Sequence, residues 1–268
     1  MIAGKTACWD ETGHVQVSGG SLRYAVRGEG PVVVMLPKLG GSLEEWRHVA
    51  AILAGFRVVA IDPPGHGGSV MAGPPPHVQT LFESAAAIAA ALDGLGISQA
   101  AMVGCSLGGC IGIALAASCP ELVDRLALVS VSLAGRMTLA DLARRHAADP
   151  GFTADGRPLP RSAADLAGFG PMSGQVVAEQ NRSRAVAGAW LRPSERGVGR
   201  FGVAETLPRV RVPVLVVNGS DSHYRRYVPT AAGSLAEVRF AVIPDCGPFV
   251  HQERPAETAA HLQPFLGS

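Results

Sequence analysis

Short apolar runs recur along the chain, separated by stretches with helical periodicity. The continuous runs at Val32–Leu36, Arg57–Ile61 and Ala100–Cys105 are typical of strands buried on both faces of a parallel sheet. Strands alternating with helices of about 12 residues predict an α/β fold with a mainly parallel sheet covered on both faces. Further predicted strands are Ser21–Arg27, Arg125–Ser130, Pro213–Asn218 and Val238–Ile243, and predicted helices are Ser42–Leu53, Val78–Leu95, Leu107–Ser118 and Arg254–Leu266. Within the first of these helices, Ser42 and Glu45 have the spacing of a capping box.

The alternation of strands and helices stops between Ala134 and Leu207. This stretch carries helix-like pieces at Thr138–Ala148 and Met172–Trp190, broken by glycine and proline. It is too long for a loop in a compact domain, so it predicts an inserted helical cap. We therefore expect residues 1–133 and 208–268 to form the α/β core and residues 134–207 to form the cap.

Composition excludes several classes of function. A chain of 268 residues has room for one core domain with a modest insertion, and a net charge of +1 gives no basic footprint for nucleic acid. No apolar run is long enough to span a bilayer, and Met1–Gly13 lacks the hydrophobic core of a signal peptide. The 5 cysteines are scattered and lack zinc spacing, which favours reduced thiols in a cytosolic protein. We expect a cytoplasmic monomer or homodimer that acts on a small molecule and contacts neither membrane nor nucleic acid.

The candidate nucleophile lies in the sequence Gly104-Cys105-Ser106-Leu107-Gly108, a G-x-S-x-G pattern. It follows a predicted buried strand and opens a predicted helix, where a tight turn would force the serine into a strained, exposed position. The two glycines are expected because a Cβ atom at either position would collide with the turn. The N–H group of Leu107 would point from the helix N-terminus toward an oxyanion.

Taken together, three segments and the order of the elements resemble the α/β-hydrolase superfamily, and more narrowly its capped esterase, haloperoxidase and C–C-hydrolase branch. The segments are the Ser106 turn, Asp62–Ser69 and Gly247–Pro255. The resemblance runs from about residue 15 to about residue 266 but excludes the cap. It implies an α/β-hydrolase fold, with an inserted cap and a pocket for a small carbonyl or ester-bearing metabolite.

The oxyanion loop departs from the pattern of that superfamily. Pro37-Lys38 stands where the resemblance leads us to expect a His-Gly pair, and Leu39 would supply the second oxyanion N–H group. Lys5 and Lys38 are the only lysines among the 23 basic residues, which makes a lysine in this loop conspicuous. We expect the Lys38 ammonium to lie beside the pocket and act on the substrate carbonyl.

The acid and base positions also depart from the pattern. The acid is expected at Ser222, with Asp221 one residue early, where it serves either as the displaced acid or as a turn residue. Pro248 occupies the position of the histidine base and has no ring nitrogen to accept a proton. His251 matches a second histidine that the family normally uses for packing, and it is the best candidate for a relocated base.

The remaining residues expected near the substrate come from several parts of the chain. Cys105 flanks Ser106 at a packing position, and Pro248, Ser222 and Trp190 are expected to contact substrate. The sequence has no G-x-G-x-x-G fingerprint, no Walker loop and no histidine or cysteine cluster with metal spacing. We therefore expect neither a cofactor nor a metal.

Three functions are compatible with this site. The first is a non-hydrolytic enzyme, such as a lyase, eliminase or cyclase, that uses Ser106 and Lys38 with an oxyanion hole. The second is a serine hydrolase with the rearranged triad Ser106, His251 and Asp221, because serine needs a base to become a nucleophile. The third is a catalytically inactive binding protein. The first is favoured because a hydrolase is expected to keep its histidine and a binding protein has little need for a strained turn.

Overall fold

The computed structural model describes residues 8–153 and 155–268. The interpretation of Met1–Gly13 as lacking a signal peptide falls in part on residues 1–7, Lys5 among them, which lie outside the described ranges.

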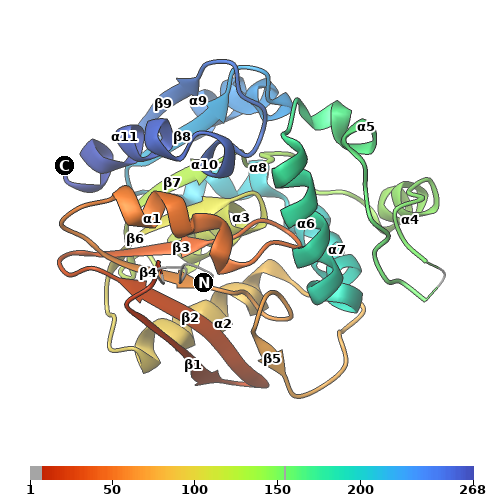
Figure 1. The fold of residues 1–268 in the computed structure, drawn as a ribbon, viewed down its shortest axis with the longest axis horizontal. Coiled ribbons are helices and arrows are strands. Elements are labelled where there is room, and N and C mark those ends of the chain that lie inside the picture. Colours follow the sequence, from red (N-terminus) through yellow and green to blue (C-terminus); the bar gives the residue numbers. More distant parts are fainter. Residues whose placement is uncertain (1–7, 154) are drawn as a thin grey trace, which may run out of the picture.

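One sheet of nine strands runs through the molecule in the order β1-β2-β4-β3-β6-β7-β8-β9, with β5 paired to β2 (Figure 1). All pairings from β4–β3 to β8–β9 are parallel, whereas those that involve β2 are antiparallel. The predicted, mainly parallel sheet is thus confirmed. The strands are β1 Glu11–Val17, β2 Gly20–Arg27, β3 Val32–Leu36, β4 Arg57–Ile61, β5 Val70–Met71, β6 Ala100–Cys105, β7 Val123–Val129, β8 Val214–Gly219 and β9 Val238–Ile243.

Helices cover both faces of this sheet, because successive strand residues point to opposite sides. In β3, Val34 and Leu36 join the hydrophobic cluster under α2 and α3, whereas Val33 and Met35 join the cluster under α1 and α11. None of the helices in the described ranges combines the length and apolarity needed to cross a membrane. The core helices are α1 Arg47–Ile52, α2 Leu81–Gly94, α3 Leu107–Ser118, α9 Val228–Ser234, α10 Val250–Glu253 and α11 Pro255–Leu266.

Two local predictions need correction. The segment predicted as a helix over Ser42–Leu53 is a 3₁₀ turn at Leu43–Trp46 followed by α1, and Ser42 makes no side-chain capping bond. Glu45 does not complete a capping box there, because its carboxylate binds Lys38 and His251 instead. The edge strand β1, which was not predicted, is largely exposed and pairs with β2 over its whole length.

A helical segment is inserted between β7 and β8. It contains α4 Leu139–Ala147, α5 Ala163–Leu166, α6 Gly174–Ala187, α7 Leu191–Phe201 and α8 Val203–Thr206. Figure 1 shows α4, α5, α6 and α7 together along one side of the core. Local signals explain where two of these helices begin: Thr138 and Asp141 form a capping box at α4, and the Ser173 side chain caps α6.

Candidate active site

Ser106 lies at a strained turn between β6 and α3. Its backbone angles are φ 47° and ψ −108°, a region that side chains other than glycine rarely occupy. A Cβ atom on Gly104 would lie 2.3 Å from the carbonyl carbon of Gly108, and one on Gly108 would lie 2.3 Å from the Leu36 oxygen. The Gly108 N–H group donates to the Pro37 oxygen at 3.0 Å, which joins the turn to the loop after β3. The two glycines therefore permit the close packing that holds Ser106 in place.

Ser106 lines a cavity of about 210 Å³ between the core and the inserted helices. Core residues and residues of the insertion both contribute to its wall. Among the described residues, no histidine lines this cavity. The lining residues include Lys38, Leu39, Ser106, Tyr224 and Phe249 from the core, and Phe152, Arg161, Gln180, Arg184 and Glu195 from the insertion.

Two backbone amides are placed where an oxyanion hole would need them. Leu39 lines the cavity, and Leu107 follows Ser106 directly as the first residue of α3. Within residues 8–153 and 155–268, neither N–H group donates a hydrogen bond to a protein acceptor. The N-terminus of α3 adds the positive end of the helix dipole. These groups can stabilise negative charge that develops on a carbonyl oxygen.

Tyr224 is the tyrosine at this cavity that sequence reasoning missed. It belongs to the 3₁₀ helix His223–Tyr227 after β8, is buried, and lines the cavity beside Ser106, whose hydroxyl acts to lower the pKa of the phenol. Burial raises the pKa of the phenol, so Tyr224 is neutral at physiological pH and keeps its O–H proton. The signal in the sequence was the lengthened loop from His223 to Tyr227, but nothing in it indicated which side chain would turn inward.

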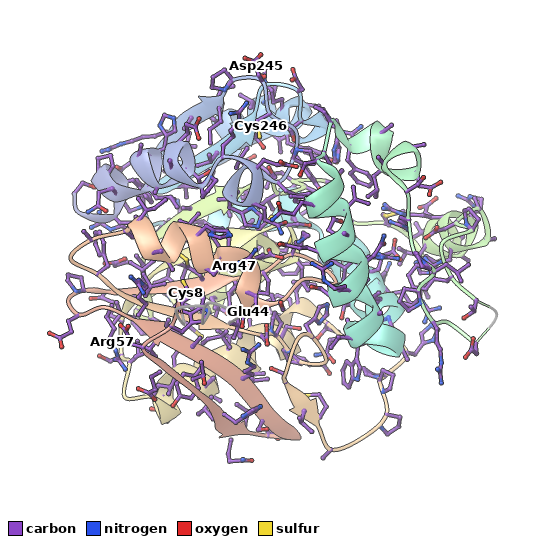
Figure 2. All side chains as sticks on the ribbon, in the orientation of Figure 1. Cys8, Glu44, Arg47, Arg57, Asp245 and Cys246 are labelled. Atoms are coloured by element: carbon purple, nitrogen blue, oxygen red, sulfur yellow. The ribbon has the colours of Figure 1, made fainter. Side chains whose placement is uncertain are left out.

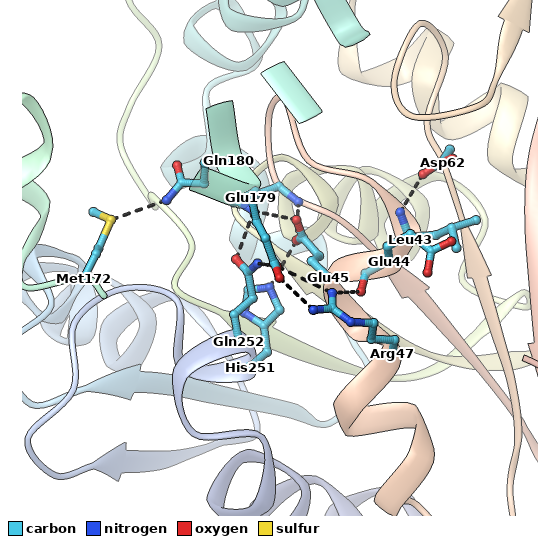
Figure 3. A network of polar contacts seen from close by, with 11 residues as sticks. Leu43, Glu44, Glu45, Arg47, Asp62, Met172, Glu179, Gln180, His251 and Gln252 are labelled. Carbon is cyan, nitrogen blue, oxygen red and sulfur yellow. Dashed lines mark hydrogen bonds and ion pairs between the residues drawn. The ribbon is translucent and has the colours of Figure 1, made fainter. Parts of the chain in front are cut away.

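Lys38 lines the cavity, but its ammonium is held by other groups. Nζ lies 2.6 Å from Glu45 Oε2, 3.1 Å from Gln252 Oε1, and 5.0 Å from the centre of the Phe249 ring. The residue is only 4% exposed. Figure 3 shows Glu45 at the centre of this polar network. The expectation that the ammonium reaches a substrate carbonyl therefore does not match this placement, because a buried lysine is most stable beside its counter-ion.

Glu45 also binds the oxyanion loop and His251. Its Oε1 accepts the Lys38 backbone N–H at 2.9 Å and lies 3.1 Å from His251 Nε2. Burial by itself would raise the pKa of Glu45, but the Lys38 charge and the His251 hydrogen bond outweigh it and lower the pKa to about 2. Glu45 is thus an ionised carboxylate within the core, a role that its capping-box spacing concealed.

His251 lies in this network rather than at Ser106. Its ring is fully buried, stacks on Trp46 with 4.4 Å between ring centres, and does not line the cavity. Burial lowers its pKa, so the neutral ring donates from Nε2 to Glu45, and Nδ1 has no partner among the described residues. The triad of Ser106, His251 and Asp221 is therefore not assembled in this structure.

The other predicted acid-loop residues lie away from the cavity. Asp221 is exposed, and its carboxylate accepts from the Ser220 hydroxyl at 3.2 Å. Ser222 is buried and caps the 3₁₀ helix by accepting from the Tyr224 N–H group at 3.2 Å. Both residues are engaged in the turn after β8, and neither lines the cavity that holds Ser106.

Three further residues expected at the substrate do not line the cavity either. Pro248 is buried next to Gly170, where its Cδ lies 3.3 Å from the position of a Cβ atom on that glycine. Trp190 packs its indole against Gly65. Cys105 is fully buried behind the turn, and burial raises the pKa of its thiol well above the usual value. All three have packing roles here.

One cluster in the described residues has the composition of a metal site. Ligand atoms of Glu45, Cys105 and His251 lie within 4.8 Å of one another. The carboxylate is already neutralised by Lys38, and the cysteine thiol is protonated because it is buried. A metal would have to displace these interactions, so the cluster fits a packed polar core better than a metal centre.

Two named proteins are similar in sequence to most of this chain. A 2-succinyl-6-hydroxy-2,4-cyclohexadiene-1-carboxylate synthase from Serratia proteamaculans (strain 568) is 30% identical over 250 residues, covering 88% of this chain and 93% of that protein. A dihydrolipoyllysine-residue acetyltransferase component of an acetoin cleaving system from Cupriavidus necator is 29% identical, covering 94% of this chain and 68% of that protein.

A solved structure and a family match place the fold. The crystal structure of an enol-lactonase from Burkholderia xenovorans LB400 superposes with a TM-score of 0.76 at 22% identity, covering 96% of this chain and 100% of that one. The family described as alpha/beta hydrolase fold matches residues 31–255. This chain belongs to the alpha/beta hydrolase fold family and is an enzyme of that fold.

Proposed function

We propose that this enzyme catalyses a non-hydrolytic reaction, such as an elimination or cyclisation, on a small carbonyl or ester-bearing metabolite. The observation that carries the proposal is that Ser106 faces a cavity whose described lining contains no histidine, and that its side-chain neighbour is the neutral phenol of Tyr224. Without a base, a serine hydroxyl is a poor nucleophile. It remains a good hydrogen-bonding and proton-transferring group.

The substrate carbonyl would bind at the two free amides. In this proposal the oxygen accepts from the N–H groups of Leu39 and Leu107, and the carbon beside the carbonyl lies next to Ser106 Oγ. Residues 134–207 act as a cap that closes the cavity from above, since the insertion supplies much of its wall. The amides then stabilise the enolate that forms when a proton leaves this carbon.

The Ser106 and Tyr224 hydroxyls would act as a proton relay. Ser106 Oγ accepts the proton from the carbon while passing its own proton to the Tyr224 oxygen, and Tyr224 passes its O–H proton to the departing group. The electron pair of the broken C–H bond forms the new double bond as the bond to the departing group breaks. Both hydroxyls end the cycle neutral, which suits a phenol whose pKa is raised by burial.

Lys38 acts in this proposal as a positioning residue. Its ion pair with Glu45 fixes the carboxylate that accepts the Lys38 backbone N–H at 2.9 Å. This contact orients the Pro37–Lys38 peptide. The next peptide carries the Leu39 N–H group, whose direction is thereby set. The buried Lys38 ammonium thereby serves the oxyanion loop through Glu45.

The alternative hydrolase would need a base that this structure places elsewhere. For His251 to serve Ser106, its ring would have to leave both Glu45 and Trp46. The binding-protein alternative leaves the turn at Ser106 unexplained, since such backbone strain costs about 1–3 kcal/mol and is kept where it serves a reaction. The relative from Serratia, named as a synthase, also supports the non-hydrolytic proposal.

Ester hydrolysis tests the proposal directly. We expect nitrophenyl acetate to be turned over barely above background and fluorophosphonates to label Ser106 slowly. Replacing Pro248 by His together with Ser222 by Asp should raise ester hydrolysis, if the segment around Gly170 can accommodate the histidine. Rapid wild-type hydrolysis that disappears in both Ser106→Ala and His251→Ala would establish the hydrolase instead.

Tyr224→Phe tests the relay. The substitution removes one oxygen and keeps the buried ring, so we expect a loss of about 100-fold or more in kcat on the true substrate. Tyr227→Phe, in the same 3₁₀ helix, is the matched control, because its hydroxyl binds Ser132 rather than Ser106. Full activity of Tyr224→Phe would exclude the phenol from proton transfer.

A further inference from the structure

Arg184 is a buried cation in the wall of the cavity. It lies near the end of α6, is 8% exposed and lines the cavity. Its guanidinium makes no hydrogen bond or ion pair with any described residue, and both Nε and Nη2 are buried without an acceptor. Burying a charge without a counter-ion costs free energy. An anionic ligand that binds Arg184 would offset this cost.

The two unsatisfied nitrogens indicate the kind of ligand. The N–H bonds of Nε and Nη2 point the same way along one edge of the guanidinium, which is the edge that binds both oxygens of a carboxylate at once. The flat ring of Phe152 lies 5.4 Å from the guanidinium carbon and makes a cation–π contact with it. Both nitrogens are closed to solvent in this structure, so a carboxylate reaches this edge only when the side chains around it shift.

The acidic side chains nearby are already engaged. Asp149 binds Arg161 at 3.1 Å and Arg192 at 3.2 Å, and Glu195 binds Arg192 at 2.8 Å and Arg145 at 3.5 Å. Four guanidinium groups, counting Arg184, therefore face two carboxylates at this end of the cavity. The excess of positive charge raises the local concentration of anions and leaves Arg184 as the group without a counter-ion. Burial and the Arg161 charge lower the Arg184 pKa to about 10, which still leaves it charged at neutral pH.

The site is close to the oxyanion loop. A Cβ atom on Gly40 would lie 2.8 Å from Arg184 Cγ, so the stem of Arg184 packs directly on the residue after Leu39. Gln180, one helical turn earlier on the same side of α6, also lines the cavity, and its amide donates only to the Met172 sulfur (Figure 3). An anionic group on Arg184 and a carbonyl at the Leu39 amide can thus belong to one small molecule.

We propose that Arg184 binds a carboxylate of the substrate, so that the enzyme acts on a small carbonyl compound that carries a free carboxylate. The identity of the reacting carbonyl rests on the proposed function above. The anion subsite does not, because it would serve a hydrolase or a binding protein equally well.

Binding of simple acids tests the subsite without a known substrate. We would titrate wild-type enzyme with succinate, pyruvate and, as neutral analogue, succinamide, by thermal denaturation and calorimetry. Arg184→Gln should weaken binding of the acids by about tenfold or more. Arg182→Gln, exposed on the same helix, should leave it unchanged. Arg184→Lys keeps the charge but loses the planar fork, so it should give an intermediate affinity.

The unliganded variants distinguish a ligand site from a structural arginine. Arg184→Gln should melt at the same temperature as the wild type or about 2–4 °C higher, because it removes an uncompensated buried charge. A marked loss of stability or failure to fold, equal stabilisation by succinamide, binding of inorganic phosphate but of no acid, or unchanged affinity in Arg184→Gln would each overturn the assignment. If acids bind as predicted while rapid ester hydrolysis is found, only the proposed reaction fails.

Discussion

The backbone of Ser106 carries strain that a side chain cannot relieve. At φ 47° and ψ −108° only glycine is comfortable, whereas the serine is held there by contacts of Gly104 and Gly108 with the neighbouring backbone. The strain is compatible with a site where the hydroxyl must stand clear of the helix that follows it. The conformation that exposes the Ser106 hydroxyl therefore lowers the stability of the fold.

Replacing Ser106 by glycine and by alanine separates strain from chemistry. Both variants lose the hydroxyl and should lose activity on the true substrate. Ser106→Gly should be more stable than Ser106→Ala by about 1–2 kcal/mol, because glycine adopts the positive φ without the clash of a Cβ atom. Urea unfolding of the two variants measures the difference. Equal stability would show that the turn is unstrained.

The ion pair of Lys38 and Glu45 can be tested as a unit. Glu45→Gln should cost about 3–5 kcal/mol, since it leaves the buried Lys38 ammonium without a counter-charge. Adding Lys38→Met should restore most of that loss, because the new side chain packs over Phe249 and the glutamine oxygen can still accept the backbone N–H. Unfolding free energies at neutral pH check both variants. If the double variant lost as much unfolding free energy as Glu45→Gln and Lys38→Met lose together when measured singly, the two side chains would not be coupled.

Some site residues could be identified from the sequence and others could not. Ser106 and Leu39 follow from motifs whose backbone geometry is local, and both line the cavity. Tyr224 and Arg184 have no such motif, since each faces the cavity only because of how a 3₁₀ turn or a helix packs. The role of Glu45 could not be predicted either, because it depends on a tertiary contact with His251, which is 206 residues away in the sequence.

At the scale of elements, the apolar runs predict the strands better than the helix ends. The runs Val32–Leu36, Arg57–Ile61 and Ala100–Cys105 match β3, β4 and β6 residue for residue, because strands buried on both faces must be apolar throughout. The edge strand β1 has no such constraint and was missed. Within the insertion, helix boundaries depend on docking contacts that periodicity does not record.

The docking of α7 on the core depends on one glycine. A Cβ atom on Gly197 would lie 1.8 Å from the Gln79 oxygen, just before α2, and the Gln79 N–H group donates to the Pro193 oxygen at 3.0 Å. Several residues of α7, such as Leu191 and Glu195, line the cavity. The spacing between α7 and the core therefore shapes the cavity.

Gly197→Ala should disturb this docking more than its small size suggests. The backbone of residue 79 would have to move, which we expect to cost about 1–3 kcal/mol and to raise KM. Faster proteolysis within residues 134–207 and a lower melting temperature would measure the effect. The control is Gly174→Ala at the start of α6, where a Cβ atom meets nothing within 4 Å. A Gly197→Ala enzyme that resists proteolysis like the control would contradict the docking argument.

At the scale of the whole molecule, charged contacts join the insertion to the core. Arg47, at the start of α1 (Figure 2), binds Glu179 of α6 at 2.7 Å, and Gln252 of α10 donates to the same carboxylate at 3.2 Å. Gln252 also accepts from Lys38 at 3.1 Å, so the network continues to the buried pair behind the oxyanion loop. Protonation at its centre would therefore affect the stability of the entire fold.

Acid should destabilise the protein because it protonates buried groups that are more stable without the proton in the folded chain. Burial lowers the pKa of His66 and His251, and the contacts of Glu45 lower its pKa from 4.5 to about 2. For each of the three groups, the pKa is lower in the folded chain than in the unfolded chain. At pH values between these two pKa values the unfolded chain binds more protons, so stability falls with falling pH. Asp62 has the opposite effect on stability. Burial raises its pKa to about 6 in the folded chain, so its contribution to stability increases as pH falls.

The share of Glu45 in this acid sensitivity can be isolated with the double variant Lys38→Met/Glu45→Gln. The stability that Glu45 contributes is complete above its unfolded pKa of 4.5 and is lost as pH falls toward about 2. The wild type should therefore lose about 2 kcal/mol more than the double variant between about pH 5 and pH 3, since the variant has no carboxyl group there to protonate. Urea unfolding of both proteins across this range measures the difference. His66 and Asp62, common to both, cancel in the comparison, whereas His251 does not, because Glu45 and Lys38 act on its pKa; titration of the His251 ring by NMR in both proteins supplies its share. Parallel pH profiles would show that the Glu45 pKa is the same in the folded and unfolded chain, and that the carboxylate is not held by Lys38 and His251 in solution.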